Sequence, residues 1–270
     1  MSSSQLKVVA WGIATSVRDA GRPGLAHLGR SRGGAVDVAA LQLGNRLVGN
    51  PPDVAGFETS GGLVLRCAAP VMVAVAGSPT DLRVVGGPPL GWGAPVVLPA
   101  SAVLHVGRLR GGARSYLCVR GGISGTDGAA VHLGADPNAA AAAHAAAPLP
   151  LDRPVRVWPG PRLDWFTSGS LHALVTTVWE VLPASNRVGL RLTGMPLVRA
   201  RHDELASEGL VEGAIQVPPD GHPIVMLADH PTTGGYPVIA VVDPADLWLV
   251  AQRPAGTEVR FSRDRRAGTR

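Results

Sequence analysis

Residues 213–237, GAIQVPPDGHPIVMLADHPTTGGYP, place an amide, hydroxyl groups and glycines in a stretch stiffened by prolines. The hydroxyls and glycines stand together at Thr232, Thr233, Gly234, Gly235 and Tyr236. Gln216 and Gln252 can each donate and accept hydrogen bonds, which suits an amide or urea group, and glycine lets a backbone approach a ligand closely or adopt a positive φ. Fixed donors of this kind stabilise a carbonyl that becomes negatively charged during a reaction. The sequence therefore predicts an amide-binding turn here; the alternative is a tight turn with Tyr236 packed beneath it.

A second candidate lies in residues 16–50, where a glycine-rich loop leads into an expected helix. The loop carries Arg18, Arg22, Arg30 and Arg32. Unpaired amides and a positive dipole end at a helix start favour an anion, and forked guanidiniums add bidentate hydrogen bonds. The stretch therefore predicts a carboxylate or phosphate site. The alternative is that Asp37 caps its own helix and Asp19 pairs with a neighbouring arginine.

Several catalytic signatures are absent from the sequence. A phosphate-binding P-loop needs GxxxxGK[ST], and the chain has one lysine, Lys7, outside any such motif. The histidines are scattered, so we expect no metal site, and His144 lies in an alanine run without a second ligand type. Ser31 is the centre of a G-x-S-x-G match, but the preceding glycines and proline do not predict the strand that a nucleophilic serine requires. Cys67 and Cys118 are expected to be buried and reduced.

Composition predicts a folded protein of the cytoplasm. The 270 residues are 46% hydrophobic and 17% charged, and the net charge of +5 comes almost wholly from arginine. Neither a signal peptide nor an apolar run of about 18 residues is evident, so we expect no membrane association. The basic residues 260–270 lack interleaved aromatic residues, and we expect no nucleic acid partner.

About a dozen short apolar runs separated by turn residues predict a mainly β fold. Examples are LKVVAWGI, GGLVLRC, APVMVAVAG, SAVLHVGRL, ALVTTVWEVLP and YPVIAVV. Helical periodicity is limited to residues 36–47, 243–252 and 163–169, so helices are accessory. The Ala/Pro-rich segment 135–150 is expected to join subdomains at 8–134 and 151–262.

A series of ordered blocks resembles a known family. The blocks include VRDAGRPG, SRGGAVD, LGNRLVGN, GFETSGG, YLCVRGGI, VWPGPRLDWF, SNRVGLRLTG and LADHPTTGGYPVIAVVDPADLWLVAQ. They resemble the C subunit of bacterial ATP-dependent 5-oxoprolinase, a family also called KipA-type, allophanate hydrolase subunit 2, or the A/B part of the biotin-dependent carboxyltransferase domain of urea amidolyase. The resemblance runs from about Val8 to Phe261.

The resemblance implies two cyclophilin-like β-barrel subdomains and a single carboxyltransferase-type domain over 1–270. It implies a KipI-type partner, equivalent to the B subunit of 5-oxoprolinase, and possibly a LamB/YcsF-type A subunit. ATP, with Mg, would bind through the complex. The reaction would open the lactam of 5-oxoproline to glutamate.

Under this interpretation the candidate residues divide by role. Arg18, Arg22 and Asn50 would position anionic groups. Gln216, Gln252, Thr232, Thr233, Gly234, Gly235 and Tyr236 would bind the amide. Asp19, Asp37 and Tyr236 are the candidate catalytic groups, with one of the two aspartates as proton acceptor.

Two other functions stay open, and one departure from the family pattern favours the first of them. Relatives carry an LGSRST-like segment where this chain has GGISGTDGAAVHLGADPNAAAAAHAAAP. The first alternative is a KipA-type regulator that binds a kinase-inhibitor partner. The second is a carboxyltransferase or allophanate hydrolase-type protein that acts on urea-like amides. The chain has no biotinyl-lysine signature, so biotin would have to arrive on another protein.

Overall fold

The computed structural model describes residues 6–142 and 150–263, which form two compact units. The first unit contains 6–21 and 37–142, and the second contains 22–36 together with 150–263. The chain thus leaves the first unit, contributes one short segment to the second, and returns. The expected subdomain boundaries stay a prediction, but segment 22–36 groups with the later unit and not with the residues around it. His144 lies outside the described residues.

The fold is mainly β, as the short apolar runs predict. The first unit has a six-stranded sheet and a five-stranded sheet, and all their pairings are antiparallel. In spatial order the six strands are β10 (Ile123–Asp127), β11 (Ala130–Leu133), β1 (Leu6–Ala10), β4 (Leu63–Cys67), β8 (Val103–Leu109) and β6 (Thr80–Val84). The five are β2 (Ser16–Arg18), β3 (Gly56–Thr59), β9 (Ser115–Val119), β5 (Val71–Gly77) and β7 (Val96–Leu98).

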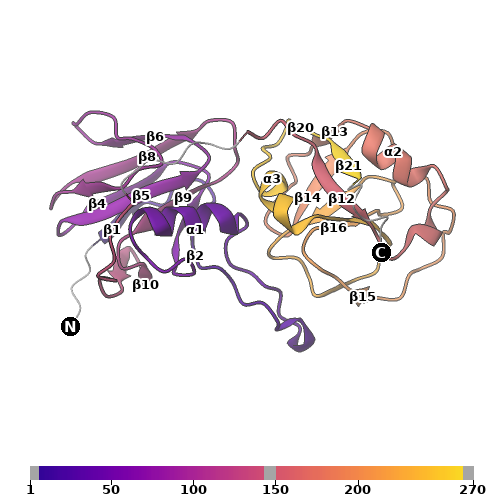
Figure 1. Ribbon diagram of the computed structural model, residues 1–270, viewed down its shortest axis with the longest axis horizontal. Coiled ribbons are helices and arrows are strands. Elements are labelled where there is room, and N and C mark those ends of the chain that lie inside the picture. The colour runs from indigo at the N-terminus through magenta and orange to yellow at the C-terminus, as the bar shows by residue number, and fades with distance from the viewer. Residues whose placement is uncertain (1–5, 143–149, 264–270) are drawn as a thin grey trace. The chain divides into compact units, whose positions relative to one another are not determined.

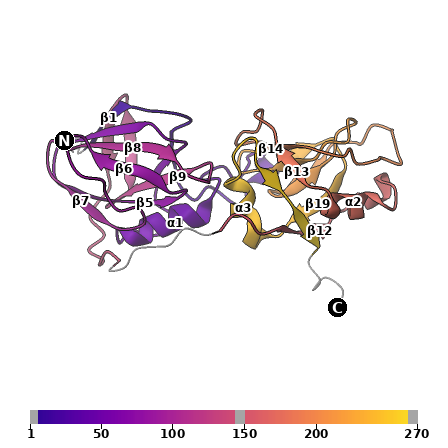
Figure 2. The same cartoon turned by 90° about the horizontal axis from the view of Figure 1, so that it is seen from above.

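A single long helix covers the five-stranded sheet. Helix α1 (Val38–Leu47) packs along β5 and β9 (Figure 1, Figure 2). The contact is close at Gly44, where an added Cβ would lie 2.7 Å from the sulfur of Cys118. Cys67 and Cys118 are buried and unoxidised, as expected, and burial raises the pKa of the Cys118 thiol, which makes that thiol unreactive.

The second unit is built on an eight-stranded sheet that almost closes on itself. Its spatial order is β20 (Glu258–Val259), β13 (Trp179–Val181), β14 (Gly189–Thr193), β17 (Ile224–Met226), β16 (Ala214–Gln216), β19 (Val238–Val242), β12 (Val155–Pro159) and β21 (Phe261–Arg263). The two edge strands, β20 and β21, are separated in sequence by Arg260 alone, so one continuous segment supplies both edges. This arrangement leaves little edge open to another chain.

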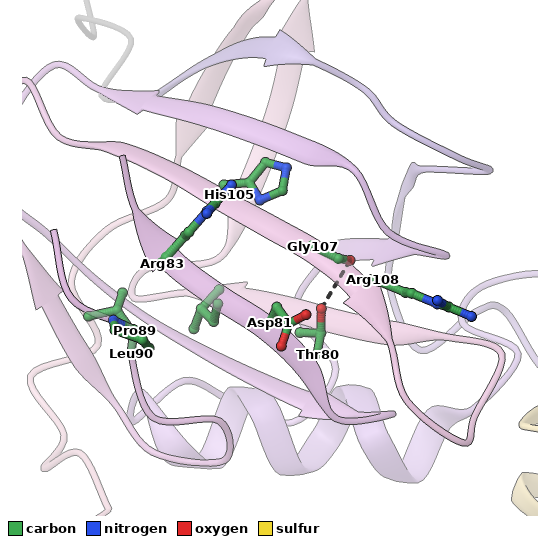
Figure 3. A pocket seen from close by; sticks show the side chains of 9 residues that line it. Thr80, Asp81, Arg83, Pro89, Leu90, His105, Gly107 and Arg108 are labelled. Carbon is green, nitrogen blue, oxygen red and sulfur yellow. Dashed lines mark hydrogen bonds between the residues drawn. The ribbon is translucent and has the colours of Figure 1, made fainter. Parts of the chain in front are cut away.

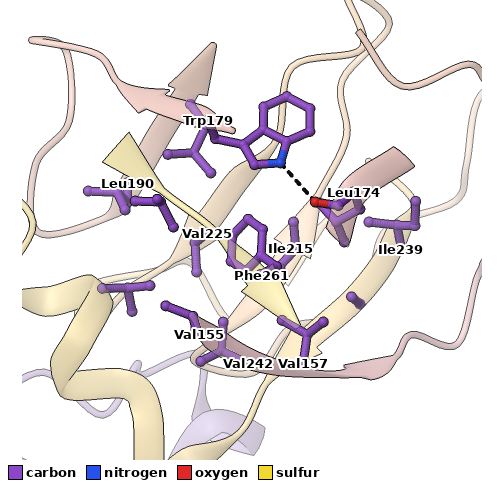
Figure 4. Close-up of a cluster of buried hydrophobic side chains, with 14 of the residues drawn as sticks. Val155, Val157, Leu174, Trp179, Leu190, Ile215, Val225, Ile239, Val242 and Phe261 are labelled. Carbon is purple, nitrogen blue, oxygen red and sulfur yellow. Dashed lines mark hydrogen bonds between the residues drawn. The ribbon is translucent and has the colours of Figure 1, made fainter. Parts of the chain in front are cut away.

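The interior of this barrel is a dense apolar cluster (Figure 4). Trp179 is fully buried, and its indole N–H donates to the carbonyl of Leu174 at 2.9 Å, so its polar atom is satisfied inside the core. Phe261 and Val155 bring the last and first strands of the unit into the same cluster. A short ladder, β15 (Glu208–Gly209) with β18 (Thr233–Gly234), stands apart from the barrel sheet.

The helix expectations are partly confirmed. Helix α1 matches the predicted 36–47, and η3 (Pro244–Asp246) with α3 (Leu247–Ala251) matches 243–252. The region 163–169 contains only the short turn η2 (Leu163–Trp165).

The apolar run ALVTTVWEVLP is not one strand. Its first half ends the helix α2 (Ser170–Thr176), and only Trp179–Val181 is extended. Leu174 is buried in the barrel core and α2 packs against β21, so tertiary packing overrides the β-branched composition of this run. No helix of the described residues is long and apolar enough to span a membrane.

A buried carboxylate fixes the start of β12 to η3. Asp246 is fully buried and accepts hydrogen bonds from the side chain of Arg153 at 2.7 Å and from the backbone and side chain of Arg156 at 2.9 Å. Burial alone would raise the pKa of Asp246, but the hydrogen bonds from Arg156 and the charge of Arg153 outweigh it and hold that pKa below its usual value.

We expect Asp246→Asn to lower the free energy of unfolding by roughly 2–3 kcal/mol at pH 7, because two guanidiniums lose their counter-charge. A carboxylate whose pKa is depressed stabilises the fold above its unfolded pKa of about 3.9 and loses that contribution as pH falls through the folded value. Wild-type stability should therefore fall more steeply than that of the variant below about pH 4. Urea unfolding at pH 7 and pH 3 measures both. Asp203→Asn, an exposed control, should change little, and equal effects of the two variants would contradict the assignment.

Candidate functional site

Segment 22–36, here called the strap, is fixed to the second unit through its diglycine turn. The N–H of Gly33 donates to the carbonyl of Ala228 at 3.0 Å, and the Arg187 guanidinium donates to the carbonyl of Gly34. Val36 ends the strap in the apolar core of the unit. At the other end, the N–H of Arg22 donates to the carbonyl of Arg32 at 2.8 Å and closes the strap into a loop.

Two bidentate ion pairs hold this turn. Arg32 donates to both carboxylate oxygens of Glu212 at 2.8 and 2.9 Å, and to the carbonyl of Ala35 at 3.1 Å. Arg187 donates to both oxygens of Asp229 at 2.8 and 3.1 Å. Both guanidiniums are mostly buried, with side-chain exposures of 20% and 19%. Because each is already neutralised, these arginines position the strap backbone and are not free to bind an anion.

The turn leaves two amide groups available. Gly33 and Gly34 have φ of 60° and 72°, the left-handed region that glycine tolerates, and both Gly34 and Ala35 are buried. No described residue accepts a hydrogen bond from the N–H of Gly34 or of Ala35. Consecutive unpaired N–H groups in such a turn can bind an anionic or developing negative oxygen.

The stretch 228–236 continues from the strap's anchor into the TTGGYP turn. The carbonyl of Thr232 accepts from the N–H of Leu210 at 2.9 Å, and Thr233 pairs with Gly209 in the β15–β18 ladder. Gln216 is buried, and its side-chain amide donates to the carbonyl of Tyr236 at 2.9 Å. This hydrogen bond supports the turn from the protein interior.

Gly234 is required by this packing. An added Cβ would lie 2.8 Å from Nε2 of Gln216 and 2.7 Å from a methyl carbon of Leu210. Tyr236 is 45% exposed, so it is not packed beneath the turn; whether the stretch is only a tight turn stays open. The amide-binding roles of this turn stay a prediction.

Sequence reasoning missed His230, which lies two residues after Ala228. The residue is 94% buried, and its Nδ1 contacts the carbonyl of Pro231 at 2.7 Å. A carbonyl can only accept, so Nδ1 carries the proton and a neutral ring presents Nε2 as a lone-pair acceptor. Nε2 has no hydrogen-bond partner among the described residues. The signal was available in the block LADHPTTGG, where a histidine adjoins the candidate hydroxyls.

Four predicted residues belong to the first unit. The Arg18 guanidinium donates to the hydroxyl of Ser16 at 3.0 Å, and the Asp19 carboxylate accepts from the N–H of Gly21 at 2.9 Å. Asp37 accepts from the N–H of Ala40 at 2.9 Å. It therefore caps α1, which confirms the capping alternative, and Asp19 makes a local turn in place of an arginine pair.

Asn50, the fourth, is an internal link between three segments of the first unit. Its side-chain N–H groups donate to Asn45 at 3.1 Å and to the carbonyl of Val119 at 2.7 Å, and its oxygen accepts from the N–H of Gly121 at 2.8 Å. Its exposed fraction is 6%. The geometry thus explains Asn50 structurally, and its predicted role toward anionic groups stays untested.

A buried network joins three of the sequence blocks in the first unit. The Tyr116 hydroxyl donates to Glu58 at 2.8 Å and accepts from the N–H of Asp37 at 2.8 Å. Burial, then the charges of Glu58 and Asp37, raise the pKa of Tyr116 well above its ordinary value, so its hydroxyl stays protonated and can donate. Tyr116 and Glu58 were not anticipated, because nothing local in the sequence marks a buried tyrosine as part of a network.

The remaining predicted residues are spread over the second unit. Arg22 and Arg30 are exposed on the strap, and neither guanidinium has a partner among the described residues. Gln252 is buried at the end of α3. Ser31 follows the short turn η1 (Ala26–Leu28) and no strand precedes it directly within the described part, so the nucleophile context is missing.

Comparison with known proteins identifies the family. The family model of the carboxyltransferase domain, subdomains A and B, matches residues 28–127 and 126–263. The chain belongs to this family. It is 34% identical over 281 residues to the C subunit of 5-oxoprolinase from Escherichia coli, covering 95% of this chain and 90% of the relative.

Two solved structures share the fold. The crystal structure of TTHA0988 superposes with a TM-score of 0.85 at 32% identity, covering 95% of this chain and 55% of that one. The crystal structure of the Kluyveromyces lactis urea amidolyase superposes with a TM-score of 0.83 at 26% identity, covering 97% of this chain and 19% of that one. The chain thus spans about half of the first solved protein and a fifth of the second.

We expect Tyr116→Phe to lower the free energy of unfolding by roughly 2–4 kcal/mol, because the Asp37 N–H and the Glu58 carboxylate both lose a buried partner. The matched control is Tyr236→Phe, at an exposed position, which should change stability by less than about 0.5 kcal/mol. Urea unfolding followed by circular dichroism measures both. A Tyr116→Phe protein as stable as the control would show that the network contributes nothing to the fold.

Proposed function

We propose that the chain is part of a 5-oxoprolinase-like enzyme and that it binds and polarises a small cyclic amide in its second unit. The observation that carries the proposal is the strap turn, where Arg187 and Arg32 hold a backbone whose Gly34 and Ala35 N–H groups have no described partner. The 34% identity to a 5-oxoprolinase C subunit supports this substrate class.

The proposed site uses the residues as follows. The N–H groups of Gly34 and Ala35 donate to the amide carbonyl as negative charge develops on its oxygen. His230 accepts a proton at Nε2 from the attacking nucleophile and returns it to the leaving nitrogen. Arg22, exposed and unpaired on the strap, binds the substrate carboxylate. Gln216 shapes the turn from which Thr232, Thr233 and Tyr236 reach the amide.

The complex supplies what this chain lacks. A KipI-type protein in the position of the 5-oxoprolinase B subunit, together with a LamB/YcsF-type A subunit, would complete the enzyme, with ATP and Mg bound in the assembled complex. These partners are part of the proposal. The name of the Escherichia coli relative supports them, because it makes that relative one component of a larger enzyme.

The test is 5-oxoproline-dependent ATP hydrolysis and glutamate formation by this chain mixed with the two partner proteins. His230→Gln should lower kcat by roughly 100-fold, because a positioned acid–base group contributes at least that much. His172→Gln, an exposed histidine on α2, is the matched control and should leave kcat unchanged. If the two variants behave alike while the wild type is active, His230 is not the base.

Carboxyl transfer is the second candidate, and the 26% identity to a urea amidolyase over nearly the whole chain favours it. The only lysine, Lys7, lies in strand β1 within QLKVV, so the chain does not fit as a biotin carrier. A biotinylated protein would deliver the carboxyl group. Urea-dependent turnover that needs carboxybiotin, without turnover of 5-oxoproline, would replace the first proposal with this one.

A further inference from the structure

A cavity of about 380 Å³ opens on the outer face of the six-stranded sheet of the first unit, over strands β6 and β8. On these strands Leu82, Leu104 and Val106 face the core. The alternate positions Arg83 and His105 face outward and are directly opposed across the two strands. Figure 3 shows the Arg83 side chain extending toward His105.

The cationic groups of this cavity have no counter-charge among the described residues. The guanidiniums of Arg83 and Arg108 make no ion pair or hydrogen bond with any of them. The Nδ1 atom of His105 is enclosed and has no hydrogen-bond partner in the described part of the chain. The carboxylate in the lining, Asp81, is already paired with Arg110. Three nitrogen-bearing side chains thus line one cavity, and no described residue accepts a hydrogen bond from them there.

The same face of the sheet continues this arrangement. Lys7 of β1 is directly opposite Arg66 of β4, and both are exposed. No described residue pairs with either side chain. Like charges placed directly opposite each other across strands destabilise a sheet. Lys7 opposite Arg66 is such a placement, and it lies on the same outer face as Arg83 and His105.

The walls of the cavity are built by the backbone. Gly107 lies where an added Cβ would be 2.9 Å from the carbonyl of Asp81, so only glycine lets β6 and β8 approach this closely. The segment after β6 folds back, with the N–H of Leu90 donating to the carbonyl of Leu82 at 2.7 Å. Pro89 and Leu90 then form an apolar side next to the cationic one (Figure 3).

We propose that this cavity binds a phosphate-bearing small molecule. The phosphate lies between Arg83 and His105, with Arg108 at the rim, and the body of the ligand contacts Pro89 and Leu90. The three oxygens of a phosphate can accept from the Arg83 guanidinium and from a ring N–H of His105 at once, and a carboxylate offers only two oxygens. The volume is within the range of small-molecule sites. This site is separate from the strap turn and does not depend on the proposed reaction.

The experiment is calorimetric titration of the purified full chain with inorganic phosphate, AMP and acetate. We expect saturable phosphate binding, tighter binding of AMP because its nucleoside contacts the apolar side, and weaker binding of acetate. Arg83→Gln and His105→Gln should each weaken phosphate binding by roughly tenfold or more, corresponding to one lost charge-assisted contact. Arg83→Lys should recover part of the loss.

Arg191→Gln, on β14 of the second unit, removes the same charge from an exposed position and should leave binding unchanged. Thermal melts provide a second readout: phosphate should raise the Tm of the wild type but not that of Arg83→Gln. If phosphate does not bind, or if Arg191→Gln weakens binding as much as Arg83→Gln, the cavity is not a phosphate site. Equal affinity for acetate and phosphate would replace the phosphate class by small carboxylates.

Discussion

The ion pair between Arg187 and Asp229 is the contact on which the candidate site depends. Both oxygens of Asp229 orient the guanidinium, and its Nη2, which donates to one of them, also donates to the carbonyl of Gly34. A neutralised guanidinium with a fixed plane is a better support than a free one, because it neither attracts counter-ions nor changes rotamer. The strap backbone is consequently held by groups that take no part in binding. The direction of its two unpaired N–H groups is fixed by the turn.

The two units use their polar residues differently. In the first unit, three buried polar side chains connect a helix start, a loop and two strands: Asp37, Asn50 and Tyr116. Their hydrogen bonds are made to other residues of the same unit. In the second unit, His230 and the strap amides keep hydrogen-bonding capacity that no described residue uses. Buried polar groups are normally paired, so such surplus capacity indicates where a ligand is expected. Family membership does not by itself locate a site.

Much of the fold was predictable because short apolar runs bounded by turns leave few alternatives to a sheet. Strand β16 and helix α2 were not predictable. A three-residue strand is too short to show an alternating hydrophobic pattern, and α2 forms because Leu174 is buried in the barrel. In the site, side-chain chemistry indicated the turn at 232–236 but could not show that Gln216 points into the protein to brace it. Nor could any local signal assign the strap to the second unit, because its partners lie far away in sequence.

The strap also has a consequence for biosynthesis. Gly34 and Arg187 are 153 residues apart in the chain, so the ribosome releases the strap long before its docking surface exists. Contacts of such separation form late, after the loop between them has been closed. A C-terminal fragment that begins after the first unit would therefore lack the strap, and the place of Val36 in that core would be unfilled.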